Sequence, residues 1–232
     1  NKNKDFFFFE KQDVRSVMGA LIYLVKTKLP EYIGTSPFEI QVLTPMRKGE
    51  LGVEHLNEVL QYYLNPASES KKEKEGRTGV FREGDKVMQV KNNYKLEWKI
   101  TNAKGFSVEE GLGVFNGDMG VIKQINTYSE RITVVFDENR EVEYPYSNLD
   151  ELELAYAITI HKSQGSEYPA VVLPLLSGPP ILCNRNLLYT AITRAQKCAA
   201  IVGRQSMVEQ MIHNETEQKR YSGLNECLKD GI

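Results

Sequence analysis

Hydrophobic positions in the first third of the chain follow strand-like and helix-like spacings in turn. Residues 5–10 form a short apolar run, and apolar positions then recur at helical spacing over 14–29, up to a loop that begins at Pro30. A second strand is expected at 40–43 and a second helix at 51–64. Strand, helix, strand and helix at this spacing predict a parallel sheet with crossover helices.

The middle of the chain has a different pattern. Residues 65–79 are charged, mixed in sign and almost free of apolar side chains, which predicts a solvated linker. Over 80–146 the apolar period falls to two, with turn residues at 116–118 and 137–139. Four or five short strands with tight turns predict a small barrel. The stretch 101–113 is expected to be a long loop between two of these strands.

The α/β pattern resumes after Asp150. The elements expected there are a short helix at 155–161, a strand at 170–175, a helix at 185–195, a strand at 198–202 and a helix at 205–212. The resulting fold class is α/β, a parallel-sheet domain with an inserted small β-barrel. We therefore expect a discontinuous α/β domain made of 1–79 and 150–232, with the barrel inserted at 80–149.

Composition narrows the function classes. The net charge of −2 over 232 residues disfavours a protein that holds nucleic acid by a broadly basic surface. No run of eighteen apolar residues occurs, so we expect no membrane association and a cytoplasmic location. The cysteines, Cys183, Cys198 and Cys227, lack metal-ligand spacing and are expected to be small buried thiols in a reducing compartment. The chain begins at Asn1 without a methionine, so we expect it to be a piece of a longer protein.

Two segments carry candidate chemistry. Residues 155–167, AYAITIHKSQGSE, run from apolar positions into a dense series of hydrogen-bond donors that ends at a glycine. Residues 187–197, LLYTAITRAQK, place Arg194 near the end of a predicted helix. A guanidinium offers a planar fork of donors that suits phosphate. The sequence GxxxxGK[ST] does not occur, so we expect the chain not to bind a nucleotide productively by itself.

These two segments resemble the late motifs of superfamily 1 helicases, and among them the RecD-type branch. Residues 42–57, VLTPMRKGELGVEHLN, are similar to an earlier motif of the second motor domain of that family. Residues 84–94 and 114–122 are similar to its inserted barrel. The resemblance implies a RecA-like second motor domain with an SH3-like barrel, from an ATP-dependent DNA helicase that moves 5′ to 3′.

The resemblance also implies roles for individual residues. Arg194 and Arg47 are expected to reach the γ-phosphate of ATP, with Lys48 as a competing candidate for the second position. The residues expected to contact the nucleotide are Gln164, Gly165 and Glu167. The residues expected to contact single-stranded DNA are Thr44, Pro45 or its neighbour Met46, Thr159, His161, Lys162, Asn92, Asn93 and Tyr94. ATP and Mg²⁺ would be held mainly by an N-terminal motor domain outside this chain.

Two other functions stay open on the sequence. One is a non-catalytic nucleic-acid-binding adaptor that keeps the fold without the motor. The other is the helicase part of a conjugative relaxase. The expected partners are single-stranded DNA and the protein's own N-terminal motor domain. Membership of a nuclease complex and a preference for DNA over RNA are both left undecided.

Overall fold

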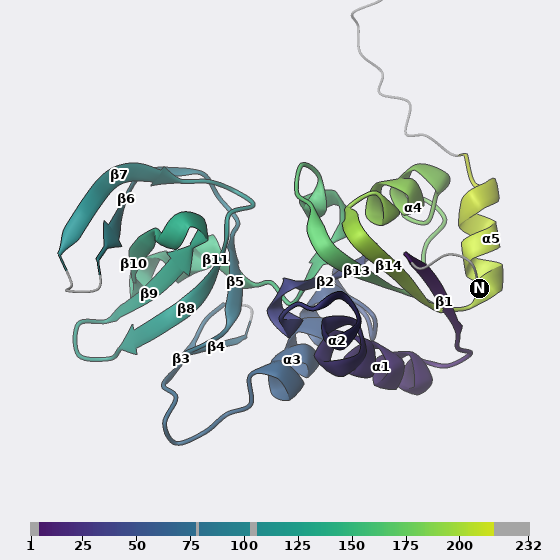
Figure 1. Ribbon diagram of the computed structural model, residues 1–232, viewed down its shortest axis with the longest axis horizontal. Coiled ribbons are helices and arrows are strands. Elements are labelled where there is room, and N and C mark those ends of the chain that lie inside the picture. Colours follow the sequence, from purple (N-terminus) through teal and green to yellow (C-terminus); the bar gives the residue numbers. More distant parts are fainter. Residues whose placement is uncertain (1–4, 78, 103–105, 216–232) are drawn as a thin grey trace, which may run out of the picture.

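The computed structural model describes residues 5–77, 79–102 and 106–215. An α/β unit and a curled antiparallel sheet lie side by side along the long axis of the molecule (Figure 1). The chain passes from the α/β unit into the curled sheet and then returns to complete the α/β unit. The structure therefore has the interrupted order that the hydrophobic pattern predicts.

Within the described residues, the α/β unit has a five-stranded, wholly parallel sheet in the order β1-β14-β13-β2-β12. Its strands are β1 (Phe6–Glu10), β2 (Ile40–Thr44), β12 (Ala157–Thr159), β13 (Tyr168–Leu175) and β14 (Ala195–Gly203). Every residue of β2 is buried, and β13 is buried at all but one position. Continuous burial is typical of parallel strands, because both faces of their sheet are covered.

Helices on both sides complete this unit. They are α1 (Val14–Tyr23), α2 (Leu29–Ile33), α3 (Val53–Leu64), α4 (Arg185–Ile192) and α5 (Gln205–His213). The expected end of the first helix at Pro30 is wrong, because the chain stays helical through a π-helical segment, Leu24–Lys28, to Ile33. Proline lacks an N–H and its ring crowds the preceding turn, and the wider π turn accommodates both. The left-handed Gly34, with φ 67°, ends the helix instead.

The part of the inserted region that the structure describes is a seven-stranded sheet in the order β11-β5-β8-β9-β10-β6-β7. Its strands are β5 (Lys86–Gln89), β6 (Asn93–Thr101), β7 (Ser107–Val114), β8 (Met119–Asn126), β9 (Arg131–Phe136), β10 (Glu141–Pro145) and β11 (Leu152–Leu154). The sheet curls on itself (Figure 1). Ile122, Val134 and Tyr144 of its strands are buried. The predicted fold class, a RecA-like parallel sheet with an inserted SH3-like barrel, is confirmed.

Two segments expected to lack regular structure contain strands. The linker predicted at 65–79 holds β3 (Glu73–Glu75), which pairs with β4 (Val80–Arg82) in a two-stranded ribbon. The loop expected at 101–113 holds most of β7, which pairs with β6. Its first four residues are exposed on both faces, so no hydrophobic alternation marks this strand in the sequence. Residues 103–105 of the expected loop lie outside the described residues.

The helix predicted at 155–161 is also wrong. The segment forms β12 and then a 3₁₀ turn, Ile160–Ser163. A short apolar run has the same appearance in a buried strand and in a buried helix, and pairing with β2 decides the outcome here. The other 3₁₀ turns are Pro37–Glu39, Asp137–Asn139 and Tyr146–Glu151.

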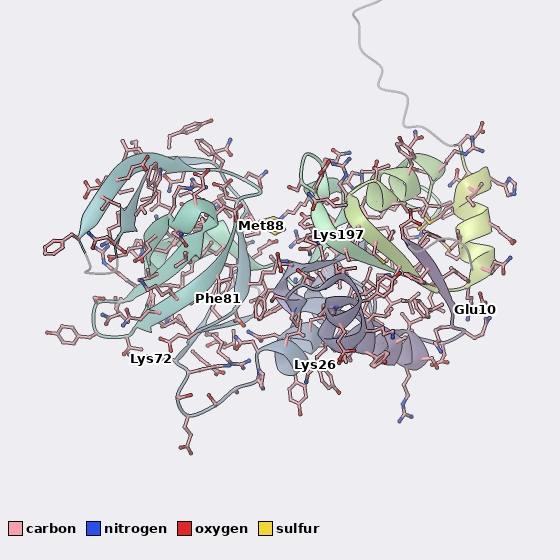
Figure 2. All side chains as sticks on the ribbon, viewed as in Figure 1. Glu10, Lys26, Lys72, Phe81, Met88 and Lys197 are labelled. Atoms are coloured by element: carbon pink, nitrogen blue, oxygen red, sulfur yellow. The ribbon has the colours of Figure 1, made fainter. Side chains whose placement is uncertain are left out.

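Buried polar side chains join the α/β unit to the inserted sheet. The Asn57 amide of α3 donates to the carbonyls of Leu154 and Ala157, at 3.0 and 2.9 Å, and its oxygen accepts the Ala157 N–H at 2.8 Å. Asp85 accepts from the Tyr156 hydroxyl at 2.9 Å and from the side-chain amides of Gln61 in α3 and of Asn65, which follows that helix. Met88 of β5 lies at the same junction (Figure 2). These contacts fix the chain where it returns from the inserted sheet.

Candidate nucleotide and nucleic-acid site

The carboxyl ends of β2 and β12 lie next to each other, with Thr44 and Thr159 in register. Thr44 is fully buried, and its hydroxyl donates to the Leu51 carbonyl at 2.7 Å and accepts the Met46 N–H at 3.4 Å. Pro45 is buried as well. Their side chains therefore shape the loop after β2. DNA contacts would require side chains that face solvent, and these two do not.

One carboxylate links the two motif segments at this edge. Glu153 of β11 accepts from the Arg47 guanidinium at 3.0 and 3.4 Å and from Lys162 Nζ at 3.0 Å. Burial by itself raises the pKa of Glu153, but the hydrogen bonds from Arg47 and Lys162 outweigh burial and leave the pKa below its ordinary value. Arg47, Glu153, His161 and Lys162 form what we call the carboxyl-edge cluster.

The 3₁₀ turn after β12 orients two members of this cluster. Thr159 caps the turn, because its hydroxyl oxygen accepts the Lys162 N–H at 3.3 Å. The buried Ser163 hydroxyl donates to the Ile160 carbonyl at 2.7 Å and closes the turn from inside. His161 is exposed and Lys162 is half-buried. Thr159 therefore has a structural task at this turn.

Arg194 lies at the other end of the sheet, where β13 and β14 begin with Tyr168 and Ala195 in register. Its guanidinium donates to the Ser166 carbonyl at 3.1 Å and to the Thr190 carbonyl at 3.3 Å. The Arg194 carbonyl accepts the Tyr168 N–H at 2.8 Å. The arginine is thus held against the segment that carries the glycine of the other motif.

The candidate nucleotide residues lie in that segment. Gly165 has φ 87°, and a Cβ added to it would meet nothing within 4 Å, so its backbone faces open space. Gln164 and Glu167 are exposed, and Glu167 accepts from the Gln196 amide at 3.3 Å. Gln164, Gly165, Glu167 and Arg194 form what we call the amino-edge cluster.

The two clusters lie at opposite ends of the parallel strands. Arg47 follows the carboxyl end of β2, whereas Arg194 precedes the amino end of β14. The segment from Ile160 to Ser166 connects the clusters. From the sequence we expected Arg47 and Arg194 to reach the same phosphate. The structure does not bring them together. It groups Arg47 with Lys162, and Arg194 with Gly165.

The expected DNA residues of the inserted sheet divide into two kinds. The Asn92 side-chain oxygen accepts a backbone N–H at 2.9 Å from the turn that follows β7, and the Asn93 amide donates to Glu151 at 3.0 and 3.1 Å. Both amides therefore stabilise turns. Tyr94 is 67% exposed and meets Phe115 edge-on, with ring centroids 5.6 Å apart. This pair presents an open aromatic surface.

Sequence reasoning missed Glu153 and the Ser166 carbonyl. The order Glu-Leu-Glu-Leu at 151–154 marks a strand with acids on one side. Nothing in that alternation indicates a partner 106 positions away, because pairing at this separation is created by the fold. A backbone carbonyl leaves no side-chain signal at all.

A buried lysine lies beside the amino-edge cluster. Lys86 of β5 donates to the Phe38 carbonyl at 2.7 Å and to the Gln41 side-chain oxygen at 2.9 Å. Burial lowers its pKa to about 8, against a smaller opposing effect of Glu39. Lys86 and Glu167 both line a groove of about 380 Å³ between the α/β unit and the inserted sheet.

We also searched the described residues for metal sites and membrane-spanning helices, and located the cysteines. In the part of the chain that the structure describes, no group of three or more His, Cys, Asp and Glu side chains is placed to hold a metal ion. Among the same residues, none of the helices is long and apolar enough to cross a membrane. Cys183 and Cys198 are buried free thiols, as expected, and Cys227 lies outside the described residues.

Comparison with known proteins places these features in a family. The family described as "ATP-dependent RecD-like DNA helicase SH3 domain" matches residues 56–136, and "UvrD-like helicase C-terminal domain" matches residues 154–202. The chain is 40% identical over 160 residues to an "ATP-dependent RecD2 DNA helicase" of Deinococcus radiodurans, a match over 69% of this chain and 19% of that protein. These matches identify a RecD-like helicase C-terminal region.

This RecD-like chain has further relatives. It is 30% identical over 191 residues to a "RecBCD enzyme subunit RecD" of Mycolicibacterium smegmatis, a match over 82% of this chain and 29% of that protein. The chain thus spans less than a third of either relative. A crystal structure of Pif1 helicase from Bacteroides in complex with ADP-AlF3 and ssDNA is similar with a TM-score of 0.45 and 16% identity, over 93% of this chain and 53% of that one.

Proposed function

We propose that this RecD-like chain is the C-terminal motor domain of an ATP-dependent DNA helicase that moves 5′ to 3′ along single-stranded DNA. The matched families and the name of the D. radiodurans relative support the activity. The chain matches 19% of that relative, and in this proposal the rest of the catalytic machinery lies outside this chain. In this proposal the N-terminal motor domain holds most of the ATP and its Mg²⁺.

The contact between Arg194 and Ser166 carries the proposal. It sets a guanidinium beside the open backbone of Gly165, so a phosphate that approaches this turn meets a planar fork of donors. Glu167 is exposed next to them and can accept hydrogen bonds from ribose hydroxyls. In this proposal Arg194 contacts the γ-phosphate only when the two motor domains close. This contact makes the closed state bind ATP more tightly than the open state.

The carboxyl-edge cluster is our candidate for the DNA contact. Arg47, His161 and Lys162 offer guanidinium, imidazole and ammonium donors, which position a nucleic-acid backbone without reading its sequence. Tyr94 of the inserted sheet adds an exposed face on which a base can stack. We therefore reassign Arg47 from the nucleotide to the strand, because it lies with Lys162 and away from Arg194.

The nucleotide role is tested by Arg194→Ala in the full-length protein that contains this chain. We expect ATP turnover in the presence of single-stranded DNA to fall by about a thousandfold or more, since arginines of this kind contribute that much to phosphoryl transfer. Affinity for the DNA without nucleotide is expected to stay within about twofold. Turnover is measured with a coupled ATPase assay at saturating DNA.

Arg185→Ala is the matched control, because Arg185 begins the helix that Arg194 follows and is half-exposed. We expect this control to keep wild-type turnover. Arg194→Lys separates charge from geometry, since lysine keeps the charge without the planar fork and should recover little activity. Wild-type turnover in Arg194→Ala would refute the proposed role of this arginine.

A further inference from the structure

We propose that Glu153 competes with a DNA phosphate for Arg47 and Lys162, and so limits how tightly this edge of the sheet holds a single strand. The inference rests on the proposed function, in which these two cations contact the DNA backbone. It goes further because it assigns a role to an acidic residue of the inserted sheet. Glu153 then acts against binding, whereas the two cations act for it.

The geometry of the three side chains supports competition. Arg47 meets both oxygens of the carboxylate, and Lys162 meets one of them, all within 3.4 Å. A phosphate group offers the same cations a similar pair of anionic oxygens. The exposed fractions of the side chains are 43% for Arg47, 27% for Lys162 and 21% for Glu153. The cations therefore remain accessible to a strand that approaches from solvent.

The backbone decides which partner moves. Glu153 is fixed by the pairing of β11 with β5, where it lies in register with Met88. Arg47 is on an exposed loop, and Lys162 has a long flexible side chain. The cations can therefore turn from the carboxylate to a phosphate while Glu153 stays with the inserted sheet. A motor that releases its strand at every step benefits from such a readily reversed contact.

The charges of these three side chains determine how much the competition changes the affinity for DNA. Arg47, Lys162 and Glu153 together carry a charge of +1, and neutralising the glutamate raises it to +2. The net charge of the chain is −2, so binding depends on local groups rather than on the whole surface. Releasing two partly exposed ion pairs is expected to tighten DNA binding by about tenfold at low salt.

The test is Glu153→Gln in the complete 232-residue chain. A fluorescein-labelled oligo(dT) of fifteen nucleotides serves as the probe, and its anisotropy is measured at several NaCl concentrations. We expect about tenfold tighter binding at 50 mM NaCl. The plot of log affinity against log salt is expected to steepen by about 0.7 for each cation freed. A chase with unlabelled oligo(dT) should show slower dissociation.

Glu209→Gln provides the matched control, because it makes the same change in net charge on α5, far from the inserted sheet (Figure 1). We expect its affinity to match wild type within about twofold. Glu153→Gln in an Arg47→Ala/Lys162→Ala background should bring no gain, since the cations that it would free are gone. A gain that persists there would overturn the competition.

The remaining outcomes separate the inference from the proposed function. If wild type binds the probe and Glu153→Gln binds equally or more weakly, Glu153 orients the cations or has no effect, and only the competition fails. If wild type and every variant fail to bind at 25 mM NaCl, the DNA role of the carboxyl-edge cluster fails, and the competition fails with it. The Arg194→Ala turnover assay still judges the nucleotide role independently.

Discussion

Lys86 shows how one residue can carry a pH dependence for the whole fold. Its side chain is enclosed at the junction, with hydrogen bonds to the Phe38 carbonyl and to the Gln41 side chain. Burial lowers its pKa from 10.5 to about 8. The lysine is therefore neutral in the folded protein over a pH range in which it is still charged in the unfolded chain.

The direction of the effect follows from the protons bound in each state. Below pH 8 both states hold the proton, and Lys86 adds no pH dependence. Between pH 8 and 10.5 the unfolded chain holds the proton and the folded protein does not, so the free energy of unfolding rises with pH. We expect a rise of about 3 kcal/mol over this range.

Lys86→Met isolates this contribution, because methionine has a similar length and does not titrate. Urea unfolding of both proteins is measured at pH 7.5, 8.5, 9.5 and 10.5. The expected result is a difference, wild type minus variant, that increases steadily with pH. Other titrating groups are the same in both proteins, so their contributions cancel in this difference. A difference that stays constant with pH would show that the buried amine keeps its ordinary pKa.

At the same scale, the sequence indicates candidate residues but not the contacts that hold them. Arg194, Gly165 and Lys162 are candidates because each lies in a short motif with recognisable spacing. Glu153 could not be found, since its contact with Arg47 crosses 106 positions. Thr44 was misjudged because a hydroxyl that closes a buried loop looks like one that faces a ligand until burial is known.

At the scale of the secondary-structure elements, β13 and β14 lie close together at Gly203. Gly203 is in register with Leu175 and has φ 156°. A Cβ added there would lie 1.7 Å from the Leu175 carbonyl oxygen. The close approach lets the Arg204 N–H donate to the same carbonyl at 2.9 Å. The pairing of β13 with β14 therefore requires a residue without a side chain at position 203.

Gly203→Ala is therefore expected to lower the free energy of unfolding by at least about 4 kcal/mol, because either the strand pairing or the carbonyl must move. Thermal unfolding followed by circular dichroism measures the effect. Gly19→Ala is the matched control: Gly19 lies on the exposed side of α1 with nothing within 4 Å of the added Cβ, and alanine should stabilise that helix by about 0.5–1 kcal/mol. Equal stability of the two variants would contradict the steric argument.

Elements with a strong period or a long buried run were predicted from the sequence. The helices at α3 and α5 and the strands β2 and β13 fall where the hydrophobic pattern places them. β7 was missed, since its exposed residues show no alternation, and β12 was mistaken for a helix, since a strand of three residues cannot define a period. In both cases a neighbouring strand determines the structure.

At the scale of the whole molecule, the chain crosses between its two parts near Asn57. This side chain is 5% exposed and satisfies the carbonyls of Leu154 and Ala157 together with the Ala157 N–H. The same return segment joins β11, which carries Glu153, to β12, which leads to Lys162. Asn57 therefore helps to hold the carboxyl-edge cluster together although it belongs to neither motif.

Asn57→Ala is expected to lower the free energy of unfolding by about 3 kcal/mol, because three buried backbone groups lose their partner. Glu58→Ala, one residue further along α3 on a side chain that is 67% exposed, should change it by less than about 0.5 kcal/mol. Limited proteolysis gives a second measurement, and cleavage within residues 153–157 should appear only in Asn57→Ala. If that variant resists cleavage like wild type, other contacts such as the Asp85–Tyr156 hydrogen bond are sufficient to hold the crossing. The inserted sheet and the α/β unit would then stay joined without Asn57, and the orientation of Glu153 toward its two cations would depend on Asp85 instead.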